Sequence, residues 1–265
     1  MFDWWWAYLA VGAAVGFIAG LLGVGGGAMI VAVLAFIFSA KQFVPAVIVH
    51  LALGTAMATI MFTSVSSVLA HHGHSAVDWP TVCRMTVGIV LGSAGGALLA
   101  GQMDVRPLTL VFTLLIYALA AQMLLGAKPR PGAASDSALS ANAVAAVMGM
   151  IASLTATGGA AMVVGYLVKR GMAIHRAIGT AAAIGSPLSV AGTVGYIAAG
   201  WGHDGLPVHA VGYVYLPALA IIVVSSMLFA PLGARLAHRS PAALLKKLFA
   251  LMLFALATKM LISLF

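Results

Sequence analysis

Two glycine clusters in this sequence could bind an anion without any charged side chain. The first is Gly23-Val24-Gly25-Gly26-Gly27, and the second is Thr155-Ala156-Thr157-Gly158-Gly159. Neighbouring glycines lower helical preference, so each cluster predicts a break between two helical pieces. The piece after a break begins with unpaired backbone N–H groups and a partial positive charge, which attract anions. Small side chains let an anion come close, and the threonine hydroxyls can donate further hydrogen bonds.

Close helix packing is the alternative interpretation, because small residues commonly line helix contacts in membranes. The chain has 30 glycines, and for most of them packing is the expected role. The duplicated cluster is different, since it interrupts two otherwise apolar segments at corresponding places. We therefore predict a substrate site formed by backbone and hydroxyl groups of both clusters. Its residues are Gly23, Gly25, Gly26, Gly27, Thr155, Thr157, Gly158 and Gly159.

Two histidines and two threonines recur after the clusters in the same order. His50 precedes Thr55, and His175 precedes Thr180. Thr55, Thr180 and His50 join the predicted substrate-binding residues, because hydroxyls can donate to an anion and imidazole can carry a proton near neutral pH. A hydrogen-bonded interior histidine is the more ordinary interpretation of His50. His175 stands beside basic residues and is expected at the membrane interface.

The remaining polar residues give weaker signals. His71-His72-Gly73-His74 could bind a metal, but a solvated loop is the better interpretation, and neither a metal site nor a cofactor is predicted. Arg84 follows Asp78 at the start of an apolar block and is expected to extend to the interface, with steering of anions as the second interpretation. Pro187 should kink its helix. Cys83 is the only cysteine, so an intrachain disulfide is excluded.

The composition indicates that these residues lie in a lipid bilayer. Of 265 residues, 63% are hydrophobic and 7% are charged, whereas about 25% are charged in a soluble domain. A net charge of +8 would suggest a nucleic-acid partner in a soluble protein. Here Lys and Arg fall in short loops, as the positive-inside rule expects, so no nucleic acid is predicted. The residues Trp4-Trp5-Trp6 are typical of an interfacial belt that anchors a retained first helix.

The acidic residues argue against several functions. All five are aspartates at predicted segment ends or in loops, and glutamate is absent. No carboxylate is therefore expected inside the membrane, which argues against a buried proton relay, a sodium site or carboxylate-dyad catalysis. Phosphate-binding Walker loops, zincin helices and serine-hydrolase elbows are also absent from the sequence. We predict no catalytic residues and no enzyme.

Eight apolar blocks and one linker organise the chain. The linker, residues 128–137, is rich in Pro, Ser and Gly and lies almost at mid-chain. Matches across it indicate an internal duplication, in which Gly16 realigns with Gly149 and His50 with His175. We predict two homologous transmembrane repeats of four blocks each, at residues 1–127 and 138–265. The blocks cover roughly residues 4–38, 43–70, 79–101, 106–126, 138–168, 174–200, 208–236 and 242–264.

The first block of each repeat is too long for one crossing. Residues 4–38 would form a helix of about 50 Å, whereas the hydrocarbon core is roughly 30 Å thick. If the broken block crosses the membrane, the repeats are parallel. If it folds back as a re-entrant hairpin, the repeats are inverted. The inverted form is slightly favoured, because it explains the excess length and places more basic residues inside. The predicted fold is an all-α polytopic membrane protein, with both arrangements open.

These features resemble the sulfite exporter TauE/SafE family of bacterial membrane transporters. The resemblance rests on the glycine-rich residues 16–27, their weaker echo at 155–159, Gly54-Thr55, and Val77-Asp78-Trp79 followed by the glycine-rich residues 92–96. It covers essentially the whole chain and implies a multi-pass protein of the bacterial inner membrane. It also implies export or uptake of a small sulfur-containing anion, such as sulfite, sulfoacetate or another organosulfonate. The second cluster departs from the family pattern by having threonines where glycines are typical.

The predicted function is therefore a secondary transporter of such an oxyanion. The anion would bind near the bilayer midplane between the two clusters, and one repeat would rock against the other. An anion channel is the first alternative, and flux that does not saturate would distinguish it. A membrane-embedded enzyme or assembly factor is a more distant alternative. The sequence leaves homo-oligomerisation open.

Overall fold

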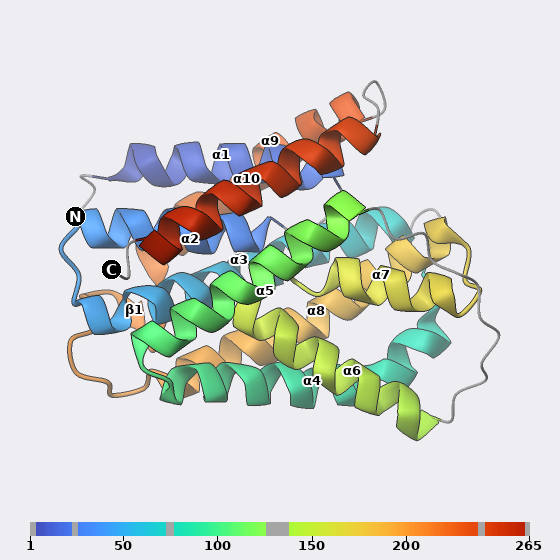
Figure 1. Ribbon diagram of the computed structural model, residues 1–265, viewed down its shortest axis with the longest axis horizontal. Coiled ribbons are helices and arrows are strands. Elements are labelled where there is room, and N and C mark those ends of the chain that lie inside the picture. The colour runs from blue at the N-terminus through green and yellow to red at the C-terminus, as the bar shows by residue number, and fades with distance from the viewer. Residues whose placement is uncertain (1–3, 23–25, 73–76, 126–137, 238–241, 263–265) are drawn as a thin grey trace.

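A computed structural model gives the fold and describes residues 4–22, 26–72, 77–125, 138–237 and 242–262 (Figure 1). Helices form most of the described chain, which confirms the prediction of an all-α membrane protein. Segments of α3, α4, α5 and α8 are each long and apolar enough to cross a membrane, and the other helices contain shorter apolar segments. The helices of the described residues are α1 (Trp5–Leu22), α2 (Gly27–Ala40), α3 (Pro45–His72), α4 (Trp79–Gln102), α5 (Val105–Leu125), α6 (Ala138–Thr155), α7 (Ala160–Lys169), α8 (Ile174–Ala199), α9 (Leu216–Ala237) and α10 (Ala242–Ile262).

A short β-hairpin between α8 and α9 is not anticipated by the sequence analysis. Its strands are β1 (Ala210–Val211) and β2 (Val214–Tyr215), which pair antiparallel. Gly212 turns the chain between them with a φ of +52°, a conformation that glycine adopts without a steric penalty. The backbone N–H of Tyr213 donates to the carbonyl of Tyr196 at 3.2 Å, so the hairpin is tied to α8.

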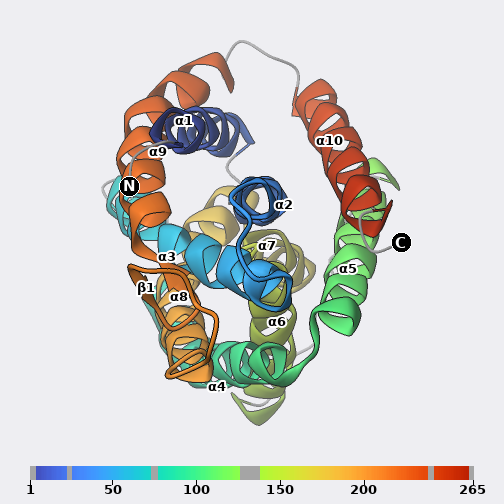
Figure 2. The ribbon, with the colours of Figure 1, turned by 90° about the vertical axis from the view of Figure 1, so that its left-hand side faces the viewer.

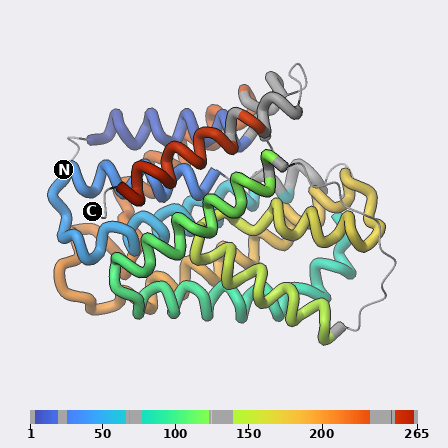
Figure 3. Tube along the Cα trace, viewed as in Figure 1, coloured from blue at the N-terminus to red at the C-terminus, as the bar shows by residue number. Residues whose placement is uncertain are grey.

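The chain reverses direction between α1 and α2, and again between α6 and α7. In Figure 3 the tube runs from the N-terminus along α1 and comes back along α2. The packing agrees with this course, because a Cβ added to Gly26 would lie only 2.5 Å from Cγ1 of Val15 in α1. The N-terminus of α2 therefore lies beside the second half of α1 and does not extend it.

Helices from distant parts of the sequence form the main contacts of the bundle. α1 packs on α9 and α6 packs on α4, while α3 contacts α8 and α5 contacts α10. Glycines let two of these pairs approach closely. A Cβ on Gly16 of α1 would overlap the backbone of Ser226, and a Cβ on Gly149 of α6 would overlap the carbonyl oxygen of Ile89. In the end-on view of Figure 2, the short helices α2 and α7 lie inside, surrounded by these longer pairs.

The loops gather at two opposite ends of the bundle. At one end, which we call the Tyr215 end, Lys41 Nζ donates to the hydroxyl of Tyr215 at 3.5 Å. At the same end His50 contacts the carbonyl of Met103 at 3.0 Å and stacks on Tyr213 with ring centroids 4.9 Å apart. The loops after α2, α4 and α8 therefore lie together there. The other end, which we call the Asp78 end, holds the starts of α4 and α8.

Candidate functional site

The two predicted breaks meet in the middle of the molecule. Gly27, the first residue of α2, lies so close to Ala156 that an added Cβ would overlap the Ala156 carbonyl oxygen. Ile60 of α3 lies at the same point, 3.4 Å from the position of a Cβ on Gly158. Residues 155–159 are all buried. Gly23 and Gly25 lie outside the described residues. The predicted site residues that the structure brings together are Gly26, Gly27, Thr155, Thr157, Gly158 and Gly159.

The end of α6 is a Schellman turn with alanine at the position that glycine usually occupies. The N–H of Thr157 donates to the carbonyl of Ala152 at 3.2 Å, and the N–H of Ala156 donates to Ser153 at 3.4 Å. Ala156 has a φ of +47°, a left-handed conformation that costs about 1–2 kcal/mol for a residue with a Cβ. After Thr157 the chain is left-handed again at Gly158 and Gly159, both with a φ of +69°. These three left-handed residues turn the chain back from α6 into α7.

α2 and α7 both begin at a glycine. Gly26 is the N-cap of α2 and Gly159 is the N-cap of α7, and because glycine has no side chain, neither residue can cap the helix with a side-chain acceptor. The first backbone N–H groups of a helix have no intrahelical acceptor and carry the positive end of the helix dipole. Two such helix starts therefore face the region where the breaks touch, an arrangement that favours an anion.

The described aspartates are remote from the breaks, as the sequence analysis expects. Asp78 precedes α4, Asp104 precedes α5, and Asp204 lies in the loop after α8. Within the described residues, no group of three or more His, Cys, Asp or Glu side chains could hold a metal ion. Residues 73–76, which include part of the histidine cluster, lie outside the described chain. The polar side chains beside the breaks are thus hydroxyls.

Thr155 and Thr157 form a hydrogen-bonded pair beside the break. Their Oγ1 atoms are 3.0 Å apart, and Thr155 Oγ1 also lies 2.8 Å from the carbonyl of Ile151. A hydroxyl has one proton, so when Thr155 donates to Ile151 it must accept from Thr157. When Thr155 instead donates to Thr157, the Thr157 proton becomes available to another acceptor. The pair can therefore give one donor to a ligand and satisfy itself when no ligand is bound.

The part of α8 that contains Pro187 lies beside the break between α6 and α7. Pro187 lacks an N–H, so the carbonyl of Ala183 loses its helical partner. A Cβ on Gly159 would lie 3.0 Å from Cδ1 of Leu188, and Ser93 of α4 donates to the Leu188 carbonyl at 2.8 Å. Sequence analysis misses Leu188, because one apolar residue in an apolar block carries no signal. Pro187 is the feature that marks this part of α8.

Thr55 and Thr180 occupy equivalent places on either side of the breaks. The backbone N–H of Tyr215, just before α9, donates to Thr55 Oγ1 at 3.0 Å. The backbone N–H of Asp78, just before α4, donates to Thr180 Oγ1 at 2.9 Å. Each threonine therefore fixes the start of another helix. With a rise of 1.5 Å per residue, Thr55 lies about 7 Å along α3 from Ile60 and the break.

His50 lies farther from the breaks and holds the end of α4. Its side chain is buried, and Nε2 lies 3.1 Å from the Ala100 carbonyl and 3.0 Å from the Met103 carbonyl. Because carbonyls only accept, Nε2 must carry a proton. His50 is about 15 Å along α3 from Ile60. His175 is exposed in the first turn of α8. The contacts of His50 are those of a hydrogen-bonded interior histidine.

Comparison with known proteins assigns the chain to a family. The family described as Sulfite exporter TauE/SafE matches residues 8–260. The chain belongs to this family. A probable membrane transporter protein of Haemophilus influenzae is 34% identical to this TauE/SafE protein over 253 residues, covering 95% of this chain and 96% of the relative. The probable membrane transporter protein YdhB of Bacillus subtilis is 26% identical over 246 residues, covering 87% and 89%. No solved structure matches the chain.

Family membership identifies this TauE/SafE protein as a membrane transporter and not an enzyme. The match extends over α1 to α10 and includes both breaks, so the region described above belongs to the shared part of the chain. The family description names sulfite, whereas the names of the two relatives specify membrane transport without a substrate.

Proposed function

We propose that this TauE/SafE protein is a secondary transporter that carries sulfite, sulfoacetate or a related small organosulfonate across the bacterial inner membrane. The observation that carries the proposal is the contact between Gly27 and Ala156, which brings the starts of α2 and α7 to one buried point. Two helix dipoles directed at the same point favour an anion and disfavour a cation.

The anion contacts in this proposal are backbone N–H groups and one hydroxyl. Gly26, Gly27, Gly158 and Gly159 have no side chain that would cover the backbone N–H groups, and the Thr155–Thr157 pair supplies the hydroxyl donor. Gly23 and Gly25 belong to the same break by sequence. We assign Thr55, Thr180 and His50 to holding the helix ends that surround the site, because their described partners are backbone groups of Tyr215, Asp78, Ala100 and Met103.

The topology in this proposal is a pair of inverted repeats, residues 1–127 and 138–265, each with a re-entrant first block. A crossing first block would place the loops after α2 and α4 on the opposite membrane face from the loop after α8. These loops instead contact one another, since Lys41 reaches Tyr215 and His50 connects Met103 with Tyr213.

Matched contacts support the same repeats. α1 on α9 corresponds to α6 on α4, and the bond from Tyr215 to Thr55 corresponds to the bond from Asp78 to Thr180. Inverted repeats that meet at broken helices permit alternating access, because one repeat can rock against the other around a fixed site. Most Lys and Arg residues of the described chain, such as Arg84 and Arg176, fall at the Asp78 end, which makes that end cytoplasmic by the positive-inside rule.

Cysteine labelling distinguishes the two topologies. In a Cys83→Ser background, we expect Asp104→Cys and Asp204→Cys both to react with a membrane-impermeant maleimide in spheroplasts. His175→Cys should react only after permeabilisation. All three positions are exposed, and Asp104 and Asp204 lie at the Tyr215 end while His175 lies at the Asp78 end. If Asp104→Cys is labelled together with His175→Cys and not with Asp204→Cys, the re-entrant arrangement is wrong.

The function is tested by flux of labelled sulfite into proteoliposomes, with sulfoacetate, sulfate and chloride as competitors. We expect saturable flux, and we expect Thr157→Val to raise the half-saturating concentration about tenfold, because one hydrogen bond to a charged group contributes about 1.5 kcal/mol. The matched control is Thr109→Val, which removes a buried hydroxyl bonded within α5 to the Val105 carbonyl at 2.6 Å.

Three other results would count against the proposal. Flux that does not saturate would favour the anion channel. Equal effects of Thr157→Val and Thr109→Val on the half-saturating concentration would show that the Thr155–Thr157 pair does not contact the anion. A folded protein without sulfite flux under any ion gradient would contradict sulfite as the substrate.

A further inference from the structure

Three aromatic rings surround one lysine at the Tyr215 end. Lys41 follows the last residue of α2, and its Nζ lies 5.8 Å from the ring centre of Tyr8 and 5.5 Å from the ring centres of Phe43 and Tyr215. We call these four residues the Lys41 cluster. Tyr8 and Tyr215 are buried, and Lys41 is half-buried. The ring faces attract the ammonium, but they carry no net charge, so they do not neutralise it.

The Lys41 cluster has more hydrogen-bond donors than acceptors. The Tyr8 hydroxyl is buried and has no hydrogen-bond partner among the described residues. The Tyr215 hydroxyl accepts from Lys41 Nζ at 3.5 Å, so its own proton is left for another acceptor. An ammonium has three N–H donors, and this contact uses one of them. No carboxylate of the described chain forms a salt bridge with Lys41. The groups that the cluster lacks are therefore a negative charge and acceptor oxygens.

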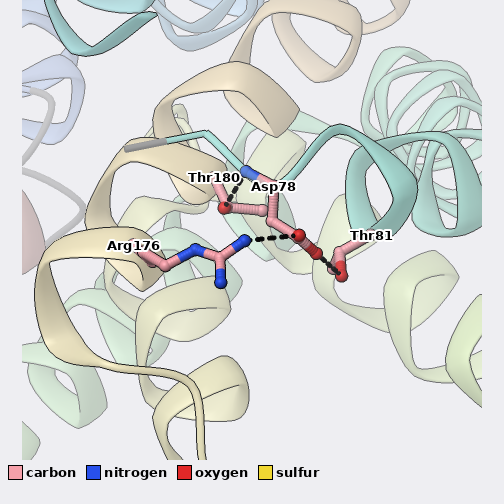
Figure 4. A network of polar contacts seen from close by, with 4 residues as sticks. All are labelled: Asp78, Thr81, Arg176 and Thr180. Atoms are coloured by element: carbon pink, nitrogen blue, oxygen red, sulfur yellow. Dashed lines mark hydrogen bonds and ion pairs between the residues drawn. The ribbon is translucent and has the colours of Figure 1, made fainter. Parts of the chain in front are cut away.

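At the Asp78 end, the corresponding cation already has its counter-charge (Figure 4). Oδ1 of Asp78 accepts a hydrogen bond from Arg176 Nη2 at 2.8 Å, and Oδ2 accepts one from the Thr81 hydroxyl. The backbone N–H of Asp78 donates to Thr180. The carboxylate therefore neutralises the arginine beside it, and the chain itself supplies the acceptors.

The residue that matches Asp78 at the other end is Tyr215. Its backbone N–H donates to Thr55, as the backbone N–H of Asp78 donates to Thr180. A neutral phenol thus stands where the Asp78 end has a carboxylate. Because a phenol supplies a donor and no charge near neutral pH, the counter-charge of Lys41 has to come from outside the described chain.

We propose that the Lys41 cluster binds a small oxyanion, contacted by the Lys41 ammonium and by the hydroxyls of Tyr8 and Tyr215. The oxygens of one such ion can accept from donors that do not bond one another. Lysine carries its charge on a flexible four-carbon stem, so Lys41 can move outward and admit the ion to the buried Tyr8 hydroxyl.

This site is separate from the one at the glycine breaks. α2 begins at the break with Gly27 and has 14 residues, so Lys41 lies about 20 Å from the break. A positive site at one mouth raises the local concentration of anions there. The identification of its ligand with the transported anion rests on the proposed function, whereas the existence of the site does not.

Tyr8→Phe tests the site, because it removes one hydroxyl and breaks no hydrogen bond of the described chain. Radiolabelled sulfite and sulfate are titrated onto the full chain in phosphatidylcholine nanodiscs, using the Thr157→Val background to weaken the site at the glycine breaks. We expect Tyr8→Phe to weaken the remaining binding about tenfold, the effect of one hydrogen bond to a charged group. Lys41→Gln should act in the same direction. Without an anion, the thermal midpoint of Tyr8→Phe should be equal or higher, since a buried hydroxyl without a partner is lost.

Thr113→Val is the matched control. The Thr113 hydroxyl is also buried without a partner in the described chain, but it lies on α5, outside the Lys41 cluster. Its loss should leave anion binding unchanged. Wild-type binding by Tyr8→Phe, the result expected if the hydroxyl binds only water, would overturn the proposal. Equal weakening by Tyr8→Phe and Thr113→Val, or a lower anion-free midpoint of Tyr8→Phe, would overturn it as well.

A lipid phosphate presents the same chemistry as a free oxyanion, so nanodiscs containing phosphatidylglycerol form a second arm. Unchanged sulfite binding there would support the free anion as occupant, and loss of sulfite binding would overturn it in favour of a lipid headgroup. The two proposed sites can fail separately. Unchanged flux in Thr157→Val contradicts the site at the breaks, whereas unchanged binding in Tyr8→Phe contradicts the site at Lys41.

Discussion

Replacing Gly27 by alanine should reduce sulfite flux about a hundredfold. The new Cβ would overlap the carbonyl oxygen of Ala156 and lie 2.6 Å from Cδ1 of Ile60. The Ile60 methyl could rotate away, but the Ala156 oxygen belongs to the backbone of the Schellman turn and cannot. The start of α2 must therefore move, at a cost of about 1–3 kcal/mol. A displacement of about 1 Å in a binding group is enough for a hundredfold loss.

The measurement is proteoliposome flux, normalised to the folded fraction from size-exclusion chromatography. Gly165→Ala is the matched control, because Gly165 lies within α7 and a Cβ there would meet nothing within 4 Å. That variant should transport like the wild type and gain about 0.5–1 kcal/mol of stability from improved helical preference. Wild-type flux in Gly27→Ala would show that the contact between the breaks is not needed for transport.

The glycine clusters could be located from the sequence because their signal is local. Clustered glycines lower helical preference, so they mark places where a helix can break. The threonines of the second cluster were also recognisable as donors. Their mutual hydrogen bond was not predictable, since it depends on the left-handed backbone of Ala156 between them.

The contacts of Thr55, Thr180 and His50 show which information the sequence alone does not provide. Matching order in the sequence indicates equivalent positions, but it does not identify the partner that each position meets. Thr180 accepts from Asp78 and Thr55 from Tyr215, contacts separated by 102 and 160 residues. The partners of His50 are backbone carbonyls at the end of α4, which exist as acceptors only because α4 ends there.

The neighbours of Arg84 could not be predicted for a different reason. A basic residue near the end of an apolar block is expected at the interface, and Arg84 satisfies that expectation. Its second interpretation, the steering of anions, depends on the arrival of Arg170 and Arg176 from another part of the chain. That meeting depends on how α7 and α8 pack, which residue spacing does not encode.

Gly92→Leu should prevent the protein from folding stably. Gly88, Gly92 and Gly96 are four residues apart on α4, and an added Cβ at Gly92 would overlap the carbonyl oxygen of Ala146 in α6. Such spacing lets helix backbones touch, and in a membrane this packing is a main force that associates helices. A leucine would separate α4 from α6 and also strain the bond from the Gly88 N–H to Asn142 Oδ1, now 2.8 Å.

The expected loss for Gly92→Leu is about 3 kcal/mol or more, above the usual range for overpacking because a backbone oxygen blocks the side chain. It is measured as the fraction of monodisperse protein and its thermal midpoint in detergent. Gly95→Leu is the control, since Gly95 lies on the same helix and a Cβ there meets nothing within 4 Å. A leucine at that position adds only a lipid-facing side chain. Equal stability of the two variants would mean that close approach of α4 and α6 does not hold the two halves of the chain together.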